Sequence, residues 1–584
     1  MKKNQGILFT LAVMLSAVLL FSSGCVPENT PPPDNAPRVR VDDWNIRPGS
    51  QPENGGSFLP SVSAPSKNPL IASAPAPALP RSGSENIGLA TGGAKDINNF
   101  RENIRNDYLP LSMDVTYEGL FYDYYFDTGQ ADKCLQLFCP SYSYAITRDP
   151  FSGEAEYYLS VGLNSGMKES DFQRKKLKLV IVLDISGSMK NPFNSYYYDQ
   201  FGTEVQLTSE DANKDKIEIA TESVVALLNH LTDDDRFGMV LFNNDAFLAK
   251  PLNLVGNTDM KAIKDHILEI SASGGTNLDA GMRMATGMYD ELTDVDASEY
   301  ENRIIFLTDA MPNLGDTSET GLLGMTRGNA DQGVYTTFIG IGVDFNTELI
   351  EYITKISGAN YYSVHSAEQF EGRMDNEFEY MVTPLVFNLQ LTLEADGWEI
   401  EKVYGSPEAN EATGDLMKVN TLFPSKKEEG ETRGGLIVLK LNKTEANSSL
   451  TLKVSYEDRN GNLDNSEAIV KLQREEPEFF GNSGIRKGIL LSRYADLLKN
   501  WMIDEREHVH LSRPWEPRVT DEIGIIVPPI TLGRWERQSL PLVVSEPYKE
   551  LFSEFRDYFK QEMNNLNDDT LNQELVILDK LVNE

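Results

Sequence analysis

The middle of the chain alternates between short apolar runs and longer segments whose hydrophobic residues recur at helical spacing. The apolar runs are typical of strands buried on both faces, and the longer segments predict amphipathic helices. The predicted strands are Val180–Leu183, Phe237–Phe242, Arg303–Leu307, Thr336–Ile341 and Tyr361–Val364, with Ala246–Leu252 as an antiparallel edge strand. The predicted helices are Asp215–Leu231, Asp259–Ile270, Leu278–Leu292, Thr347–Ile356 and one ending near Met381. This order predicts an α/β fold with a doubly wound, mostly parallel sheet over residues 171–383.

The segment before this domain changes from helical to alternating spacing. Ile97, Phe100, Ile104 and Tyr108 predict a short helix that ends before Pro110. Strand-like runs follow at Tyr117–Phe126, Tyr142–Ile146 and Tyr157–Val161. We therefore expect residues 97–170 to form a small N-terminal companion domain.

The carboxyl-terminal third begins with short alternating runs and ends with helical spacing. Leu385–Leu393, Leu436–Leu441 and Leu450–Tyr456 predict strands, and Asn460-Gly461 predicts a hairpin turn after the third of them. A small β-sandwich is expected over residues 384–475. Residues 476–584 predict a helical region, which would either cap the sandwich or present a separate partner-binding helix.

The first residues have the composition of an export signal followed by a linker. Lys2 and Lys3 precede the apolar run Ile7–Phe21, and Ser22-Ser23-Gly24-Cys25 resembles a bacterial lipoprotein cleavage site, with Cys25 lipidated. The competing interpretation of residues 1–25 is an uncleaved anchor helix. Both place the chain outside the cytoplasm, at a membrane of the cell envelope. Residues 26–96 are rich in Pro, Gly and Ser and predict a disordered tether.

Length and charge limit the possible functions. The chain has 584 residues, which favours several domains over one core. Its formal net charge of -36 argues against binding to nucleic acid, because phosphate contacts come from Lys and Arg. None of the five histidines pairs with the candidate site described below, and His508 and His510 are more typical of a solvent-facing stretch than of a metal site. We therefore predict that the chain is not an enzyme, and metal-assisted hydrolysis is a remote alternative.

Candidate chemistry is concentrated directly after the run Val180–Leu183. Asp184, Ser186 and Ser188 follow it without a spacer, so a carboxylate and two hydroxyls stand at the carboxyl end of a buried strand. Such oxygen ligands suit a hard cation such as Mg²⁺. Taken alone, the pattern is also compatible with a helix-capping turn.

Two later segments strengthen the metal interpretation. The pattern Asp-x-Ser-x-Ser resembles the metal-ion-dependent adhesion site of von Willebrand factor type A domains. In that family a threonine from a later loop and an aspartate after a later strand complete the site. Ser273-Gly274-Gly275-Thr276-Asn277 and Thr308-Asp309-Ala310 occupy those places here, so Thr276 and Asp309 correspond to the family positions. The resemblance covers about Lys176 to Val382, and the segment before it resembles bacterial surface lipoproteins with such a domain.

The resemblance implies a function. Asp184, Ser186, Ser188, Thr276 and Asp309 would bind Mg²⁺, or Mn²⁺ or Ca²⁺, and an acidic side chain of a protein partner would complete the coordination. We therefore expect an adhesion-type protein-binding module held at the membrane by its lipid anchor. The alternative is a structural or assembly subunit of an envelope complex, in which the ion only stabilises the loops.

Two further features leave alternatives open. The aromatic loop Lys190–Ala212 leaves the Asp-x-Ser-x-Ser turn and would either contribute to partner recognition or pack on its own domain. Cys134 and Cys139 are the only cysteines besides Cys25. In an oxidising compartment we expect a disulfide between them, since no histidine or further cysteine lies nearby to form a metal site.

Overall fold

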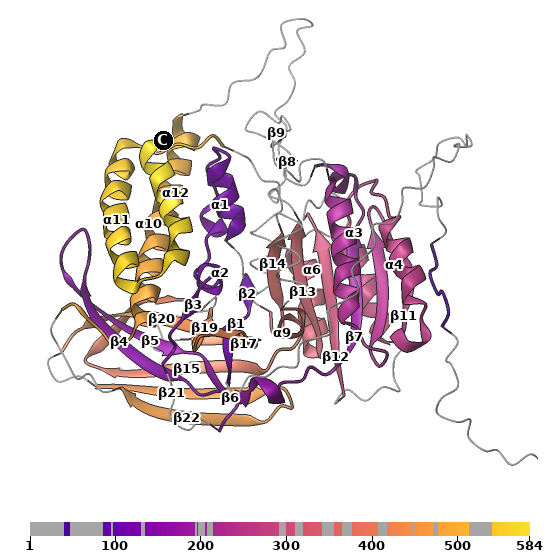
Figure 1. The fold of residues 1–584 in the computed structure, drawn as a ribbon, viewed down its shortest axis with the longest axis horizontal. Helices are drawn as coiled ribbons and strands as arrows, with labels where there is room; N and C mark the ends of the chain where they lie inside the picture. Colours follow the sequence, from indigo (N-terminus) through magenta and orange to yellow (C-terminus); the bar gives the residue numbers. More distant parts are fainter. Residues whose placement is uncertain are drawn as a thin grey trace, which may run out of the picture. The chain divides into compact units, whose positions relative to one another are not determined.

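A seven-stranded sheet with the strand order β11-β10-β7-β12-β13-β14-β2 organises the central part of the chain (Figure 1). Its strands are β2 (Gly93–Ala94), β7 (Lys176–Asp184), β10 (Arg236–Phe242), β11 (Ala246–Leu254), β12 (Tyr300–Thr308), β13 (Val334–Ile341) and β14 (Asn360–Val364). Neighbouring strands are parallel except for the antiparallel pair β10 and β11. The predicted fold class and the predicted antiparallel edge strand are confirmed.

The structure is a computed structural model in which part of the chain is described. The described residues are 40–46, 86–94, 97–129, 135–192, 195–196, 205–206, 214–290, 299–309, 319–341, 356–364, 377–406, 417–445, 449–470, 477–512 and 540–584. They belong to one compact unit, Arg40–Glu584. The predicted signal segment 1–25, with Cys25, lies outside these ranges. Within them, no helix combines the length and the apolar character needed to cross a bilayer.

Strand β7 shows why the central sheet is covered on both faces. Leu179, Ile181 and Leu183 point into one hydrophobic core, and the alternate residues Val180 and Val182 point into another. The first core is closed by α3 (Lys216–Leu227), α4 (Met260–Leu268) and α9 (Phe378–Met381), and the second by α5 (Leu278–Asp290) and α6 (Glu319–Asp331). A strand buried on both faces needs apolar residues at every position, which explains its continuous apolar run.

A β-sandwich is assembled from segments on both sides of this domain. One sheet has the order β22-β21-β15-β17-β1-β6, and the other has the order β16-β20-β5-β4-β23. The strands from the amino-terminal side are β1 (Asn86–Thr91), β4 (Ser141–Arg148), β5 (Ala155–Gly162) and β6 (Asn164–Lys168). Those from the other side are β15 (Val386–Asp396), β16 (Trp398–Tyr404), β17 (Met417–Ser425), β20 (Leu436–Lys443), β21 (Ser449–Asp458), β22 (Leu463–Val470) and β23 (Phe479–Phe480).

This topology differs from the predicted division into separate domains at 97–170 and 384–475. Strand β5 pairs with β20, and β1 pairs with β17, so both halves share one hydrophobic core. The physical reason is that β4 and β5 alone leave an apolar face uncovered, and only the later strands can cover it. Apart from β2, the strands of the seven-stranded sheet are therefore an insertion between β6 and β15. The predicted hairpin at Asn460-Gly461 does join β21 to β22.

Two parts of the predicted tether 26–96 are folded. Ile87 and Leu89 of β1 are buried in the sandwich core, and β2 continues the same segment into the seven-stranded sheet. Residues 40–46, which we name the clasp, lie against the α/β domain. Val41 N donates to Asn257 O at 2.9 Å, and Asn45 N donates to Ala249 O at 2.8 Å. Composition alone missed both segments, because their few apolar residues stand between proline-rich stretches.

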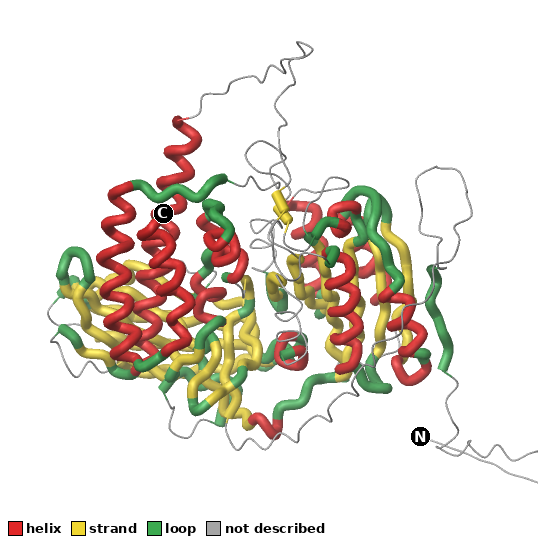
Figure 2. Tube along the Cα trace, turned by 45° about the horizontal axis from the view of Figure 1, so that its top comes forward, coloured by secondary structure: helices red, strands yellow, loops and turns green. Residues whose placement is uncertain are grey.

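A helical layer covers the outer face of the second sandwich sheet (Figure 2). It contains α1 (Asn98–Arg105), α2 (Tyr117–Tyr122), α10 (Ser483–Ser512), α11 (Glu546–Leu566) and α12 (Asn572–Asn583). The predicted strand Tyr117–Phe126 is wrong for its first six residues, which form α2. Thr116 caps this helix by accepting a hydrogen bond from Gly119 N at 3.0 Å. A short three-stranded sheet, β18 (Lys427–Glu428), β19 (Glu431–Arg433) and β3 (Tyr125–Phe126), follows it.

Candidate metal centre

Parallel pairing of β7 with β12 brings two aspartates to the carboxyl edge of the seven-stranded sheet. Leu183 is in register with Leu307, so Asp184 and Thr308 are neighbours across the strands. Thr308 Oγ1 donates a hydrogen bond to Asp184 Oδ2 at 2.7 Å. Asp309 follows directly, and both aspartate side chains are fully buried. The register therefore places the two predicted acidic ligands at one edge.

The turn after β7 presents two hydroxyls at the same edge. Ser186 N donates to Asp184 Oδ1 at 2.8 Å, which folds the turn back over the carboxylate. The hydroxyl oxygens of Ser186 and Ser188 lie 2.8 Å apart. Gly187 N donates to Gly274 O at 2.9 Å, and a Cβ at Gly187 would lie 3.1 Å from that oxygen. The close approach of the two loops is the reason that glycine suits position 187.

The loop that carries Thr276 is fastened to this turn. Ser273 N donates to Ile185 O at 2.6 Å, and Gly274 adopts a φ of 90°, which favours glycine. Thr276 is buried, just before α5 begins at Leu278. Asn277 Oδ1 accepts a hydrogen bond from Ala280 N at 3.1 Å and so caps that helix. All five predicted ligands therefore stand on three loops that adjoin at one edge.

Two asparagines that sequence reasoning missed support the third loop. Asn243 Nδ2 donates to Ser273 O at 2.9 Å, and Asn243 O accepts from Asn277 N at 2.7 Å. Gly275 N donates to the side-chain oxygen of Asn244. Both asparagines follow β10 directly, so their position after a parallel strand was the available signal. Asn243 thus contacts both ends of the loop, at Ser273 and Asn277, and Asn244 contacts Gly275 between them.

Burial and mutual repulsion determine the electrostatics of the aspartates. Burial is the larger cause, and the negative charge of Asp309 the second, of a rise in the pKa of Asp184 to about 7. Hydrogen bonds from Ser186 and Thr308 oppose this rise but do not cancel it. Two neighbouring buried carboxylates are not readily ionised at the same time unless a positive charge compensates them.

A lysine that sequence reasoning also missed supplies part of that charge. Lys216 is the first residue of α3, and its side chain is fully buried. Its Nζ lies 3.4 Å from Asp309 Oδ2. A lysine at the start of a helix gave no sequence signal of burial.

The donor set fits a hard divalent cation. Asp309 Oδ1 is buried and has no hydrogen-bond partner among the described residues, so it is available as a ligand. Two hydroxyls and a second carboxylate stand beside it, which is the oxygen chemistry that Mg²⁺ and Ca²⁺ select. In the described part of the chain, no cluster of three or more His, Cys, Asp or Glu forms a metal site of another type. That these residues bind an ion stays a prediction.

The remaining predicted residues lie elsewhere. Cys139 is disulfide-bonded, whereas Cys134 lies outside the described residues, so the predicted pairing stays a prediction. His508 is exposed on α10.

The loop Lys190–Ala212 is described in part. It contains β8 (Ser195–Tyr196) paired with β9 (Val205–Gln206), and Pro192 forms a bridge with Asp215 at its base. The long loop is thus closed at its base, beside the Asp-x-Ser-x-Ser turn.

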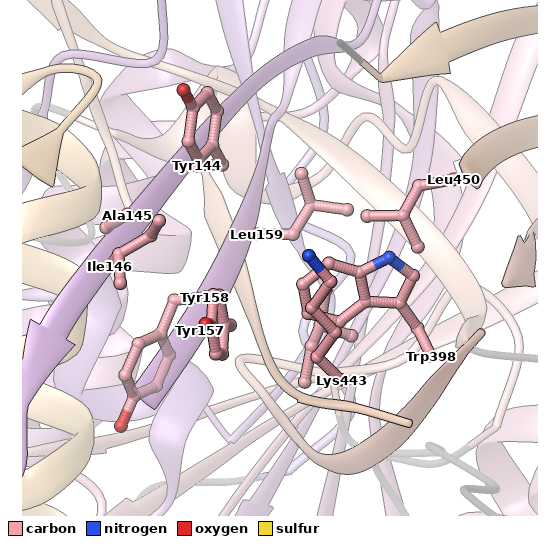
Figure 3. Close-up of a pocket in the computed structure, with 10 residues that line it drawn as sticks. Tyr144, Ala145, Ile146, Tyr157, Tyr158, Leu159, Trp398, Lys443 and Leu450 are labelled. Carbon is pink, nitrogen blue, oxygen red and sulfur yellow. The ribbon is translucent and has the colours of Figure 1, made fainter. Parts of the chain in front are cut away.

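A cavity at the edge of the sandwich is too small to compete as a ligand site. Its volume is about 10 Å³, and side chains of Tyr144, Tyr157, Trp398 and Lys443 line it (Figure 3). Such a space holds about one water molecule. Trp398 Nε1 is buried without a partner in the described structure, and one water would satisfy it. This cavity is therefore not an alternative to the edge of the seven-stranded sheet as a ligand site.

Comparison with known proteins identifies the inserted domain. The model of the von Willebrand factor type A domain family matches residues 179–311, a range that contains all five predicted ligands. The chain contains a von Willebrand factor type A domain. We call it the A domain below. A domains are commonly modules of protein–protein interaction rather than enzymes, and they typically bind a divalent metal ion.

Individual relatives match only parts of the chain. Inter-alpha-trypsin inhibitor heavy chain H4 of Homo sapiens is 24% identical over 198 residues, which are 32% of this chain and 20% of the relative. The chain thus spans about a fifth of that relative's length. A von Willebrand factor type A structure from Catenulispora acidiphila has a TM-score of 0.38 at 14% identity and covers 64% of this chain and 82% of its own. The ArnB paralog VWA2 from Sulfolobus acidocaldarius has a TM-score of 0.34 at 14% identity. The match covers 76% of this chain and 97% of the VWA2 chain.

Proposed function

We propose that this chain is an extracytoplasmic, lipid-anchored protein-binding module whose A domain holds a divalent cation and receives an acidic side chain from a partner protein. The observation that carries the proposal is the convergence of two fully buried carboxylates, Asp184 and Asp309, with the hydroxyl pair of Ser186 and Ser188. Burying two carboxylates together costs free energy unless a cation compensates them. Lys216 supplies one positive charge beside Asp309, and a bound divalent ion would complete the compensation.

The chemistry of the ligands explains why a partner's carboxylate would be recognised. Hydroxyls bind as neutral oxygens, so among the five predicted ligands the negative charge comes from Asp184 and Asp309. An ion held by few charged ligands remains electrophilic and keeps coordination positions for water or another oxygen. An Asp or Glu side chain of a partner offers a negatively charged oxygen of the required kind. The loop Lys190–Ala212, closed at its base by Pro192 and Asp215, starts beside the site and would extend the contact surface.

The proposal is tested with the full-length chain in a pulldown against extract of the parent organism. Partners should be retained with Mg²⁺, be lost in EDTA and return when Mg²⁺ is restored. Asp184→Ala should lose the same partners. Asp245→Ala is the matched control, because Asp245 is an exposed carboxylate after β10 at the same edge. Binding that survives both EDTA and Asp184→Ala, with the fold intact by circular dichroism, would contradict the proposal.

The loop has its own test. Deleting residues 194–201 should weaken partner binding if the loop contributes to recognition and should leave it unchanged if the loop only packs on the A domain. Mg²⁺ binding should be measured on the same variant. Unchanged Mg²⁺ binding would show that any loss of partner binding does not come from damage to the metal site.

A second candidate function is that of an assembly subunit in an envelope complex. It is favoured by the firm connection of the A domain to the sandwich. The guanidinium of Arg303, fully buried on β12, lies 5.9 Å from the ring centroid of Phe423 on β17, and Glu301 on the same strand pairs with Arg459 of the β21–β22 turn at 3.3 Å. In this function the ion stabilises loops only. Partners that persist in EDTA while the melting temperature falls would favour it.

A further inference from the structure

The position of Lys216 follows from the closure of the long loop. Pro192 and Asp215 form a bridge, and Lys216 N donates to Asn191 O at 3.1 Å. The chain therefore returns to the Asp-x-Ser-x-Ser turn immediately before α3. The Lys216 side chain then runs into the interior, where its Nζ meets Asp309 Oδ2 at 3.4 Å.

This is an unfavourable place for a lysine by itself. A buried ammonium loses its hydration, and the first turn of a helix carries a partial positive charge that repels cations. Both costs are offset only by negative charge nearby. Asp309 provides it directly, and Asp184 lies at the same edge of the sheet. Asp309, a candidate metal ligand, is therefore one of the groups that hold this lysine in place.

The two oxygens of Asp309 have different surroundings. Oδ2 faces Lys216, whereas Oδ1 has no hydrogen-bond partner within the described structure. The ammonium thus engages one oxygen of the carboxylate and leaves the other available to an ion. When both carboxylates are ionised, Asp184, Asp309 and Lys216 together carry a single net negative charge.

From this geometry we propose that Lys216 is a resident counter-cation of the metal centre: it orients Asp309 and lowers the affinity of the edge for a divalent ion. It also leaves the loaded edge with one net positive charge, which attracts an acidic partner. This inference rests on the proposed function and names the residue that tunes it. Lys216 is a positioning residue, because it acts through Asp309.

Two opposing effects decide the expected result of removing the lysine. Loss of the contact with Asp309 removes a modest orienting interaction. Loss of the ammonium also removes repulsion between like charges in a buried site, and such repulsion is large at low effective dielectric constant. We expect the second effect to dominate, so that the ion binds more tightly and an acidic ligand binds more weakly.

The experiment is a calorimetric titration of the metal-stripped full-length protein with Mg²⁺. Lys216→Met should bind Mg²⁺ at least about tenfold more tightly than the wild type, because the repulsion is gone. Lys216→Arg keeps the charge and should stay within about threefold of the wild type. Lys216→Gln removes the charge but keeps a hydrogen-bond donor, so it repeats the test if the methionine variant does not fold.

Lys250→Met is the matched control. Lys250 is also fully buried and pairs with a carboxylate, Asp43, at 3.1 Å. It donates to Phe237 O, at the opposite end of β10 from the metal edge. This control should change the stability of the A domain and leave Mg²⁺ affinity unchanged. If the effect came only from the loss of a buried lysine, the Mg²⁺ affinity would change by a similar factor in Lys216→Met and Lys250→Met.

Equal or weaker Mg²⁺ binding by both Lys216→Met and Lys216→Gln would overturn the inference. The titration contains no partner protein, so it tests the role of Lys216 independently of partner binding. A wild type that binds Mg²⁺ but no acidic peptide refutes the proposed function, while the role of Lys216 is still decided by the ion alone. Mg²⁺ binding only after Lys216 is replaced supports the role of Lys216 and refutes the proposed function. No binding by any variant overturns both.

Discussion

Thr308 donates a hydrogen bond to Asp184 across two parallel strands, from Oγ1 to Oδ2 at 2.7 Å. We predict that Thr308→Val, which keeps the shape and removes the donor, lowers the free energy of unfolding by about 1–3 kcal/mol, because a buried carboxylate loses a partner. Chemical denaturation measures the loss. Thr336→Val on β13 is the control, since Thr336 Oγ1 is buried without a partner in the described structure. Equal losses in both variants would contradict the assigned role of Thr308.

The raised pKa of Asp184 predicts a pH dependence of stability in the metal-free protein. The pKa is about 7 in the folded state against 3.8 for the ordinary group, so the folded state binds more protons between these values. Stability from this group is therefore complete below pH 3.8 and is lost as the pH rises towards 7. Denaturation of the wild type and Asp184→Asn in EDTA gives the difference, which should fall over this window. A flat difference would show that Asp184 does not titrate there.

The clasp should contribute to the stability of the A domain through Asp43. Lys250 is fully buried, and burial lowers its pKa, while Asp43 raises it by attraction. Asp43→Ala should destabilise the domain by about 1–3 kcal/mol, because Lys250 would be left buried without its counterion. Replacing both residues, as Asp43→Ala with Lys250→Met, should recover part of that loss. Thermal denaturation of the three variants checks the order.

Hydrogen exchange gives an independent test of the clasp. The amides of Val41 and Asn45 donate to backbone oxygens of the A domain and should be protected. Trp44→Ala removes a ring that stacks on His266 at 5.6 Å and packs against the core. Both amides should then exchange faster, with little change in the central strands. Fast exchange of both amides already in the wild type would mean that the clasp is not docked.

Arg303 should stabilise the A domain and its contact with the sandwich, where the guanidinium lies 5.9 Å from the ring centroid of Phe423 on β17. Its side chain donates to Gly358 O at 2.8 Å and to Val382 O at 3.1 Å, and its guanidinium lies 3.6 Å from Glu301. Arg303→Met should cost about 3–5 kcal/mol, as expected when one member of a buried charged network is removed. Arg459→Met, at the more exposed end of the network, should cost less. Denaturation curves of the two variants test the order.

The A domain could be predicted from sequence because its signals are local. A parallel strand covered on both faces needs apolar residues at consecutive positions, and Val180–Leu183 and Ile304–Leu307 have that pattern. The chemistry follows each strand directly, so Asp184 and Asp309 were identifiable without knowledge of the pairing. Lys216 was not, because burial of a lysine depends on which groups the fold places around it.

The sandwich could not be predicted as a single domain because its pairing is non-local. Strand β5 meets β20 only after the whole A domain intervenes, and nothing in Tyr157–Val161 specifies so distant a partner. Aromatic residues misled the prediction at Tyr117–Tyr122. Aromatic side chains favour strands on average, but here Thr116 caps a helix that packs Tyr117 and Phe121 against the helical core and Tyr122 against the A-domain core.

The clasp also determines how mechanical load would pass through an anchored molecule. Under the proposed function, a membrane holds the chain ahead of Arg40 and a partner pulls at the metal edge. The clasp fastens residues 40–46 to the A domain itself, through Val41, Asp43 and Asn45. Tension between anchor and partner would then run within one domain and bypass the sandwich and the helical layer, which would stay unstrained while the clasp holds.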